Sequence, residues 1–256
     1  MPELFPRQES LSILGVSIST LSRNEILARA EAFLVEAKFH RIATVNPEFL
    51  VRAEKDPAFK QSLQQADLCV ADGIGIVWAG WFQGKRVTRF PGVDLLHEIL
   101  SRAERDGLSV FLAIKKDGLS SYEEIRMVLL RRFPKLIISG ADMEVDSYQV
   151  SSIKYQVYGI PNTKYRILLC NFGAPEQEFF LESLRNNPGD VRLVMGVGGA
   201  FDFLTGKQTR APRCLRAIGL EWLWRFILQP KRWKRIWNAV VIFPVKVLLG
   251  SSVSKE

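Results

Sequence analysis

The regular alternation of short apolar runs with helical patterns is the feature that most constrains how this chain can fold. Six strand-like runs cover residues 42–46, 68–72, 109–114, 136–140, 166–172 and 191–196. Between them, apolar residues recur at helical spacing over residues 48–65, 93–105, 120–132, 147–158 and 175–186. Such alternation is typical of βαβ units, in which helices cover both faces of a parallel sheet. We therefore predict an α/β fold with a largely parallel sheet.

Two further elements are predicted ahead of this pattern. Residues 12–19 alternate enough to indicate a short strand or a hairpin. Residues 22–37 predict a helix, because Ser22 can cap its first turn and Glu25 stands three residues later.

The net charge of +8 is concentrated at the C-terminal end. From Lys207 onward there are eleven basic and two acidic residues, which gives +9, whereas residues 1–206 sum to −1. We therefore expect two parts, an α/β domain over residues 1–206 and a basic, Trp-rich helical appendage over residues 207–256.

The composition of this appendage leaves three interpretations open. Tryptophans alternate with arginines and lysines between residues 222 and 237, which suits the headgroup level of an anionic bilayer. A nucleic-acid-binding patch has a similar composition, and some of the tryptophans could instead pack into the protein's own core. The apolar run 239–249 favours lipid, but it is far shorter than the roughly 20 residues that span a bilayer.

Polar and glycine-rich segments follow four of the predicted strands. They read TVNPE over residues 44–48, VADGIG over 70–75, CNFGAPEQE over 170–178, and MGVGGAFDF, the glycine loop, over 195–203. Ligands of open α/β sheets bind at the carboxyl ends of the strands. We therefore expect these segments to lie on one rim. Asp72 should share a pocket there with Thr44, Gln177 and the glycine loop.

Each of these segments also has a simpler structural explanation. Asp72 either caps the helix that follows it or is held over a cleft by its glycine-flanked turn. Thr44 and Asn46 point to the same side of a strand, although Asn46 could simply cap the next helix. Gln177 could meet a phosphate or a sugar from the first turn of its helix, where the neighbouring glutamates would equally complement the helix dipole. The glycine loop could cradle a diphosphate or form only a tight turn.

Several other chemistries lack their sequence signatures. Neither a G-x-G-x-x-G dinucleotide fingerprint nor a Walker A loop is present, which disfavours NAD chemistry and NTP hydrolysis. No clear acid pair stands at a strand end to seat a divalent metal, and His40 and His97 lack partners at metal-ligand spacing. Three widely spaced cysteines give no disulfide framework, and the sequence shows no basic and apolar leader, so we expect a reducing, cytosolic compartment.

Seven short motifs follow one another along the chain. They are Thr44 with Asn46, Asp72-Gly73, Arg89-Phe90-Pro91-Gly92-Val93-Asp94-Leu95, Gly173-Ala174-Pro175-Glu176-Gln177-Glu178, Gly196-Val197-Gly198-Gly199-Ala200-Phe201-Asp202, Arg210-Ala211-Pro212 and Glu221-Trp222-Leu223-Trp224-Arg225. In this order they resemble the WecG/TagA/CpsF family of bacterial glycosyltransferases, over roughly residues 10 to 237.

The resemblance implies a Rossmann-like α/β fold and a specific reaction. A sugar would pass from a UDP-sugar to a polyprenyl-diphosphate-linked sugar, with inversion at the anomeric carbon and without a metal ion. The protein would work as a peripheral protein at the cytoplasmic face of the cell membrane. Its product would enter wall teichoic acid, enterobacterial common antigen or exopolysaccharide synthesis. Apart from the resemblance, we expect the appendage to associate with the membrane and to close the active site.

The resemblance also implies roles for individual residues. Asp72 would be the general base. The other catalytic residues would be Thr44, Asn46, Arg89 and Gln177. Arg89 is chosen over Arg86 by its spacing from the motif that follows. From the chemistry of the reaction, we expect the donor to be bound by Gly73, Gly173, Gly196, Gly198, Gly199, Asp202, Arg210 and Arg225. The chain departs from the family at Glu176, where lysine is common, so no phosphate contact is assigned there.

No cofactor is implied beyond the UDP-sugar donor. The expected partners are the lipid-linked acceptor and an anionic membrane surface, but not nucleic acid. The donor sugar (N-acetylmannosamine, its uronic acid or glucose), the acceptor sugar, the linkage and homo-oligomer formation are left open. Two alternative classes are a nucleotide-dependent oxidoreductase and a nucleic-acid-binding protein, the latter suggested only by the basic appendage.

Overall fold

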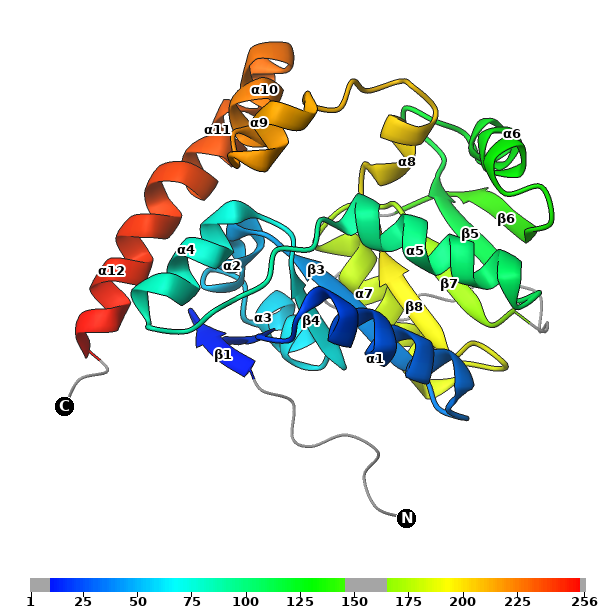
Figure 1. Cartoon of the computed structure of the whole chain (residues 1–256), viewed down its shortest axis with the longest axis horizontal. Helices are drawn as coiled ribbons and strands as arrows, with labels where there is room; N and C mark the ends of the chain where they lie inside the picture. Colours follow the sequence, from blue (N-terminus) through cyan, green and yellow to red (C-terminus); the bar gives the residue numbers. More distant parts are fainter. Residues whose placement is uncertain (1–9, 146–164, 254–256) are drawn as a thin grey trace.

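The centre of the molecule is a six-stranded sheet in the order β4-β3-β8-β7-β5-β6 (Figure 1). The computed structural model describes residues 10–145 and 165–253. The strands are β3 (His40–Val45), β4 (Leu68–Ala71), β5 (Ser109–Lys115), β6 (Ile137–Met143), β7 (Ile167–Cys170) and β8 (Leu193–Gly196). Every pairing described within this sheet is parallel, which confirms the predicted α/β class.

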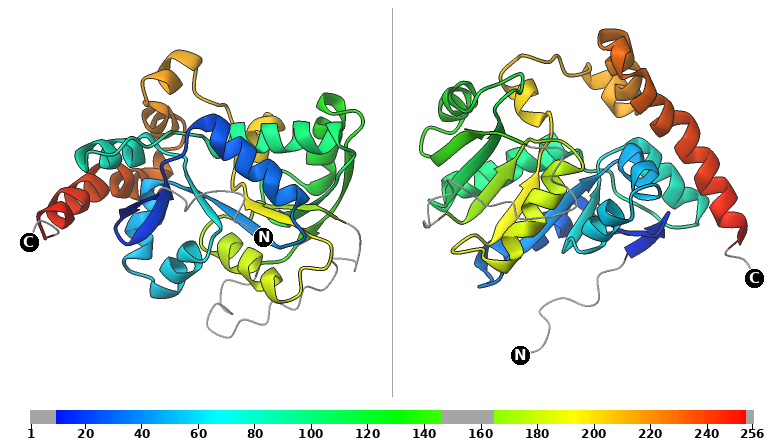
Figure 2. Two further views of the ribbon diagram at one scale, coloured as in Figure 1. Left: turned by 60° about the horizontal axis from the view of Figure 1, so that its bottom comes forward. Right: turned by 180° about the vertical axis from the view of Figure 1, so that it is seen from behind.

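Helices cover both faces of the sheet, as predicted (Figures 1 and 2). One face packs against α1 (Arg23–Val35), α5 (Gly92–Arg105), α6 (Tyr122–Arg132) and α8 (Ala200–Leu204). The other face packs against α2 (Pro47–Ala53), α3 (Pro57–Gln64), α7 (Glu176–Ser183) and the 3-10 turn after α7 (Leu184–Asn186). Alternate residues of a strand enter different cores: Ile42 of β3 packs with the first set of helices and Ala43 with the second. This two-sided burial explains why the strands read as nearly continuous apolar runs.

The register of the strands brings the polar segments to one edge of the sheet. Val45 pairs with Ala71 and Cys170 with Gly196, so neighbouring strands end level. The four segments predicted to share a rim follow β4, β3, β8 and β7, which are consecutive neighbours in the sheet. They therefore lie side by side along the carboxyl edge.

The N-terminal elements also match their prediction. Residues 10–19 form an antiparallel hairpin of β1 (Ser10–Ile13) and β2 (Val16–Ser19). Helix α1 begins with the expected capping box, in which the Ser22 side chain accepts from the Glu25 backbone N and the Glu25 side chain accepts from the Ser22 backbone N.

Three helical regions differ from the prediction, and one of them is the short helix α8, which forms within the predicted glycine loop. The helix expected over residues 48–65 is two helices, because the Asp56 side chain caps a new helix and Pro57 cannot continue the previous one. The extent of helix α4 (Ile74–Phe82), considered only as the helix that Asp72 could cap, was not predicted, because its sequence IGIVWAGWF has no polar face from which a helical period could be read. The helix predicted over residues 147–158 lies outside the described residues.

The C-terminal part forms a succession of helices that passes over the carboxyl edge and then packs along α2 and α4 (Figures 1 and 2). They are α9 (Arg213–Ala217), α10 (Glu221–Leu228), a 3-10 turn (Pro230–Arg232), α11 (Trp233–Trp237), a π-helical turn (Asn238–Ile242) and α12 (Phe243–Val253). Phe243 and Val247 are buried in the same core as α2 and α3. The exposed tryptophans Trp233 and Trp237, in contrast, do not belong to the core. Across the described residues, we find no helix whose length and apolar character would allow it to cross a bilayer.

A fully buried charge lies beside the sheet, on a residue near the amino end of β3. Arg41 of β3 has no exposed surface, and its Nη1 donates to Glu178 Oε2 of α7 at 2.6 Å. Its Nε lies 3.0 Å from Glu182 Oε2, and its Nη2 donates to the carbonyl oxygen of Ser62 in α3. A buried charge is tolerated only when it is paired and hydrogen-bonded. These contacts therefore fix α3 and α7 against β3.

Replacing Glu178 by glutamine should lower the free energy of unfolding by about 3 kcal/mol, because Arg41 would lose its closest charged partner in a fully buried position. Urea unfolding followed by circular dichroism measures this loss. The control Glu123→Gln breaks the exposed pair with Arg126 and should change the free energy by less than about 0.5 kcal/mol. Equal changes in the free energy of unfolding for the two substitutions would show that the buried pair contributes no more to stability than the exposed one.

Candidate active site

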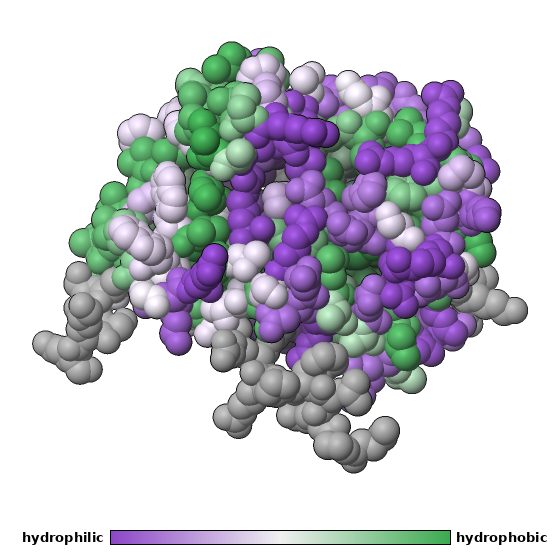
Figure 3. Space-filling model, in the orientation of Figure 1, coloured by the Kyte–Doolittle hydropathy of each residue, from purple (hydrophilic) through white to green (hydrophobic). Residues whose placement is uncertain are grey.

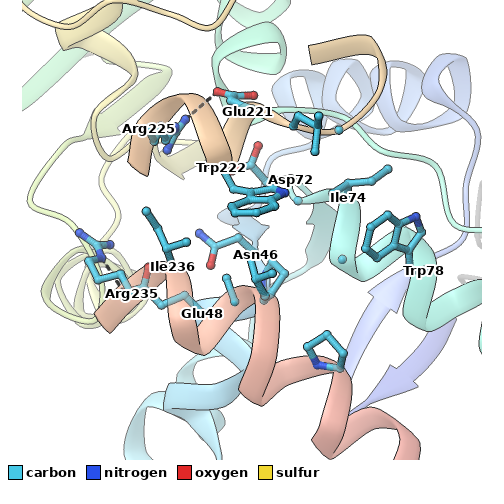
Figure 4. Close-up of a pocket in the computed structure, with 18 of the residues that line it drawn as sticks. Asn46, Glu48, Asp72, Ile74, Trp78, Glu221, Trp222, Arg225, Arg235 and Ile236 are labelled. Atoms are coloured by element: carbon cyan, nitrogen blue, oxygen red, sulfur yellow. Dashed lines mark hydrogen bonds and ion pairs between the residues drawn. The ribbon is translucent and has the colours of Figure 1, made fainter. Parts of the chain in front are cut away.

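A cavity of about 270 Å³ lies between the carboxyl edge and the C-terminal helices (Figure 4). We call it the rim cavity. The carboxyl edge and α4 contribute Asn46, Pro47, Glu48, Asp72, Gly73, Ile74, Gly75, Trp78 and Arg89. The C-terminal helices contribute Gly219, Leu220, Glu221, Trp222, Arg225, Arg235, Ile236, Ala239, Val240 and Pro244. Figure 4 shows Trp222 projecting from α10 into the middle of this space.

Asp72 lines the rim cavity from the loop after β4, and it does not cap the helix that follows it. The N-cap of α4 is Gly73, with no side-chain cap. Asp72 Oδ1 instead accepts a hydrogen bond of 3.0 Å from the backbone N of Gly92, the first residue of α5. The Asp72 backbone N donates to the carbonyl oxygen of Val45 at 2.8 Å, which ties the loop to the end of β3. Both explanations considered for this acid therefore apply in part, but the helix that it caps is α5.

The surroundings of Asp72 raise the pKa of its carboxyl group above the ordinary value. The largest cause is burial, which disfavours the charged form, and the negative charge of Glu221 acts in the same direction. The charge of Arg225, the hydrogen bond from Gly92 and the charge of Arg89 lower the pKa and offset part of this rise. A carboxylate with a raised pKa is a stronger base when it is ionised, which is the property that a general base needs.

Arg89 connects the loop of Asp72 with the C-terminal helices. Its Nε donates to the carbonyl oxygen of Asp72 at 3.1 Å, and its Nη1 donates to the carbonyl oxygen of Arg216 in α9 at 2.9 Å. Its Nη2 lies 3.1 Å from Glu221 Oε2 of α10, in an ion pair. Arg86, the alternative candidate, is exposed and does not line the rim cavity. Of the two arginines, Arg89 is therefore the one at the site.

Glu221 holds two guanidinium groups beside Asp72. Arg225 Nη2 lies 2.8 Å from Glu221 Oε1, one turn earlier on α10, as Figure 4 shows. Burial by itself would raise the pKa of Glu221, but the charges of Arg225, Arg89 and Arg210 lower it below its ordinary value. Glu221 therefore stays ionised near neutral pH and keeps both of its ion pairs.

Of Thr44 and Asn46, which were predicted to be catalytic residues, only Asn46 lines the rim cavity. Its Oδ1 also caps α2, by accepting from the Phe49 backbone N at 3.0 Å. Thr44 is buried beneath the cavity, with its Oγ1 3.4 Å from the carbonyl oxygen of Gly196. A Cβ on Gly92 would stand 3.1 Å from Thr44 Oγ1. Glycine at position 92 thus allows the start of α5 to approach β3 closely.

Gln177 is buried and links two glycine segments instead of lining the rim cavity. Its Oε1 accepts hydrogen bonds of 3.2 Å from the backbone N atoms of Gly173 and Gly198. Its Nε2 donates to Glu178 Oε1 at 3.0 Å. A Cβ on Gly196 would stand 2.4 Å from Gln177 Nε2, so a larger residue there would displace Gln177 from its hydrogen bonds. Two backbone amides that were expected to cradle a phosphate are thus already paired.

Asp202 and Gly199 lie outside the rim cavity. Asp202 Oδ1 accepts from Ser120 Oγ at 2.8 Å, and its Oδ2 lies 3.4 Å from Gln208 Nε2, so the carboxylate holds α8 to neighbouring loops. Gly199 is exposed beside Asp202.

The single pocket that the sequence predicted is therefore not observed. Of the residues expected to share it, Asp72 lines the rim cavity, whereas Thr44, Gln177 and the glycine loop do not. The physical reason is that the side chains of Thr44 and Gln177 turn inward and bond to backbone groups under the edge. Contacts still join these groups, because Gly92 bonds to Asp72 and touches Thr44.

A second cavity, of about 460 Å³, shares Arg89 with the first, and we call it the arginine cavity. Its lining is Arg89, Pro91, Asp94, Arg210, Arg213, Arg216 and Ala217. Arg210 pairs with Asp94 of α5 at 2.8 Å, whereas Arg213 is exposed. Four guanidinium groups against one carboxylate give this cavity a positive charge that suits a diphosphate.

Most of the residues that line these cavities were not predicted to belong to the site, and four of them stand close in the sequence to predicted ones. Glu221 and Trp222 stand in the E-W-L-x-R motif, from which only Arg225 received a role. Arg213 and Arg216 stand three residues apart on α9, a spacing that places them on one helix face. That spacing, next to Arg210, is the signal that could have identified them.

A metal site does not emerge from the described ranges. Within them, no group of three or more His, Cys, Asp or Glu side chains is arranged to hold a metal ion. The expectation of metal-independent chemistry therefore stays a prediction.

The match to a known family covers nearly the whole chain. The family model described as the glycosyl transferase WecG/TagA/CpsF family matches residues 11–255. The matched region includes the sheet, its carboxyl edge and the C-terminal helices, so both cavities lie within it. The resemblance carried by the seven motifs is thereby confirmed.

Replacing Arg89 by glutamine should loosen α9 and α10, because the bonds from Arg89 to Arg216 and Glu221 would be lost or weakened. Hydrogen bonds to charged groups contribute about 1.5–3 kcal/mol each, so amide hydrogen exchange over residues 213–228 should accelerate about tenfold or more. The matched control is Arg86→Gln, an exposed arginine three residues away, which should leave this exchange unchanged. Unchanged exchange in the Arg89 variant would show that other contacts hold the helices down.

Proposed function

The chain belongs to the WecG/TagA/CpsF family of glycosyltransferases, and from this premise we propose that it transfers a sugar from a UDP-sugar to a polyprenyl-diphosphate-linked sugar. The proposed donor sugar is of the N-acetylmannosamine or hexose type. The observation that carries the proposal is Asp72, a carboxylate of raised pKa at the wall of a cavity that also holds Arg89 and Arg225.

The proposed reaction is a single inverting displacement. Asp72 accepts the proton of the acceptor hydroxyl, whose oxygen forms a bond to the anomeric carbon of the donor. The bond from that carbon to the UDP oxygen breaks at the same time, and UDP departs with the electron pair. Gly92 supports this role because its amide holds Oδ1 of Asp72 and thereby orients Oδ2 for the incoming hydroxyl.

Arginines are the groups proposed to neutralise the departing diphosphate. Charge develops on UDP as it leaves, and fixed cationic donors stabilise such charge most when water is excluded. Arg89 lines both cavities, Arg225 lines the rim cavity, and Arg210, Arg213 and Arg216 line the arginine cavity. We place the diphosphate against these side chains because Gln177 already occupies two of the glycine amides. In this proposal Thr44 and Gln177 position the edge from below.

The C-terminal helices are proposed to cover the site and to dock on an anionic membrane surface at the cytoplasmic face. Their contribution to the lining of both cavities supports the covering role. Exposed Trp233 and Trp237, together with exposed Lys231 and Lys234, support the docking role. The product would serve cell-surface polysaccharide or teichoic acid synthesis.

Replacing Asp72 by asparagine should lower the transfer rate by at least about 10²-fold, because asparagine cannot accept the acceptor's proton. UDP affinity should stay within about twofold, since Asp72 acts on the acceptor. Radiolabelled sugar transfer and calorimetric titration with UDP measure the two effects. Asp106→Asn, at the far end of α5, is the control and should retain full transfer. A variant at Asp72 that keeps most of its turnover would show that this residue only caps α5.

The pH dependence of kcat/KM should respond to the two charges beside Asp72 in opposite directions. Activity falls on the acid side as Asp72 becomes protonated. Glu221→Gln removes a negative charge that raises the pKa of Asp72, so this acid limb should move to lower pH. Arg225→Gln removes a positive charge that lowers the same pKa, so the limb should move to higher pH. Profiles that shift together would argue against Asp72 as the titrating group.

A further inference from the structure

Large exposed apolar side chains gather on one side of the molecule. Among the described residues, twelve of the sixteen come from α4 and the segment from residue 218 onward. Helix α4 contributes Trp78, Trp81 and Phe82, and α12 contributes Leu248 and Leu249. Figure 3 shows hydrophobic surface gathered along the C-terminal helices. Apolar surface concentrated in this way marks a binding face.

Helices α4 and α12 lie side by side and form the lower part of this face (Figures 1 and 2). They approach closely at Gly75, where a Cβ would stand 3.5 Å from the ring of Phe243. Phe243 turns into the core, whereas Leu248 and Leu249 are exposed. At the far end of α4, Trp81 is 74% exposed, with its ring 5.3 Å from that of Phe82.

The rim cavity joins this apolar face to the charged site. Figure 4 shows Glu221 and Arg225 on one side of the cavity and Trp78 on the other. Ile74 and Pro244 line the cavity together with Trp78. Trp78 is 52% exposed even though it lines the cavity, so it stands at the mouth.

Basic side chains border the same face. Lys85 and Arg86 lie in the loop after α4, and Lys231 and Lys234 stand between α10 and the end of α11, all of them exposed. An apolar face bordered by lysines and arginines is complementary to a lipid surface that carries negative charge. This complementarity favours a lipid as the occupant. A second copy of this chain would carry the same net charge of +8 and would be repelled.

On the basis of the proposed function, we propose that the apolar side of the rim cavity, with Trp78 at its mouth, binds the first isoprene units of the acceptor. The isoprenoid chain then leaves past Trp81 along α4 into the bilayer. The occupant of such a site must be long and apolar at one end and anionic at the other, and a polyprenyl diphosphate has this form. A partner protein is too broad for a cavity of about 270 Å³.

The test compares two diphosphates that differ only in chain length. Farnesyl diphosphate carries three isoprene units and dimethylallyl diphosphate carries one, both with an allylic diphosphate end, and calorimetric titration of the full chain gives both affinities. Wild type should bind farnesyl diphosphate at least about tenfold more tightly, because the additional methylene groups are removed from water. The double variant Trp78→Ser with Trp81→Ser should reduce this ratio to less than about threefold.

Matched controls and a second variant keep the result interpretable. Leu119→Ser with Met127→Ser removes two exposed apolar residues from another part of the surface and should preserve the wild-type ratio. Trp81→Ser alone, at the exposed tip of α4, should give a smaller loss in the same direction. Equal affinities in wild type, or an unchanged ratio in both tryptophan variants, would overturn the proposal.

Transfer activity, assayed separately, distinguishes this site from the proposed function. If the wild-type protein prefers farnesyl diphosphate but transfers no sugar from any UDP-sugar, the result supports the isoprenoid site and contradicts the proposed reaction. If the protein transfers sugar but shows no chain-length preference in binding, the result supports the proposed reaction and contradicts the isoprenoid site.

Discussion

The buried charge of Arg41 is the interaction on which the shape of the carboxyl edge depends. Its guanidinium pairs with Glu178, and Glu178 accepts the side-chain amide of Gln177 through its other oxygen. Gln177 then accepts the backbone amides of Gly173 and Gly198, so one polar network runs from inside β3 to the loops after β7 and β8. Because none of these groups can be left unpaired in a dry interior, the network holds the loops in one arrangement.

Because the network fixes these loops, the glycines at the carboxyl edge serve close packing instead of phosphate binding. Glycine loops at strand ends often present free amides to phosphate, but here close packing is the stronger requirement. Gly196 leaves room for Gln177, and Gly92 leaves room for Thr44. The positive groups at the edge are therefore arginine side chains, and most of them come from the C-terminal helices. Those helices are consequently part of the site itself, joined to it through Arg89.

The fold could be predicted from the sequence wherever local pattern determines structure. Two-sided burial produces continuous apolar strands, and polar residues directly after them revealed Asp72 and Asn46. The extent of α4 was not predicted because an all-apolar helix shows no helical period, and α2 and α3 were merged because the apolar spacing continues across Pro57. The approach of Glu221 to Asp72 joins residues nearly 150 positions apart, and no local pattern encodes it. The inward orientation of the Gln177 side chain could not be predicted either. The position of a residue in a helix indicates which elements lie nearby, but it does not determine the side-chain rotamer.

The C-terminal helices also influence the chemistry of Asp72, which stands on the loop after β4. Burial is the main reason for its raised pKa, and Glu221, which adds to the rise, comes from α10. Arg225, which lowers the pKa, comes from the same helix. If α10 were to move away, water would reach the carboxylate and both charges would leave, so the pKa would return toward its ordinary value. The strength of Asp72 as a base therefore depends on the docked position of helices that lie at the opposite end of the sequence.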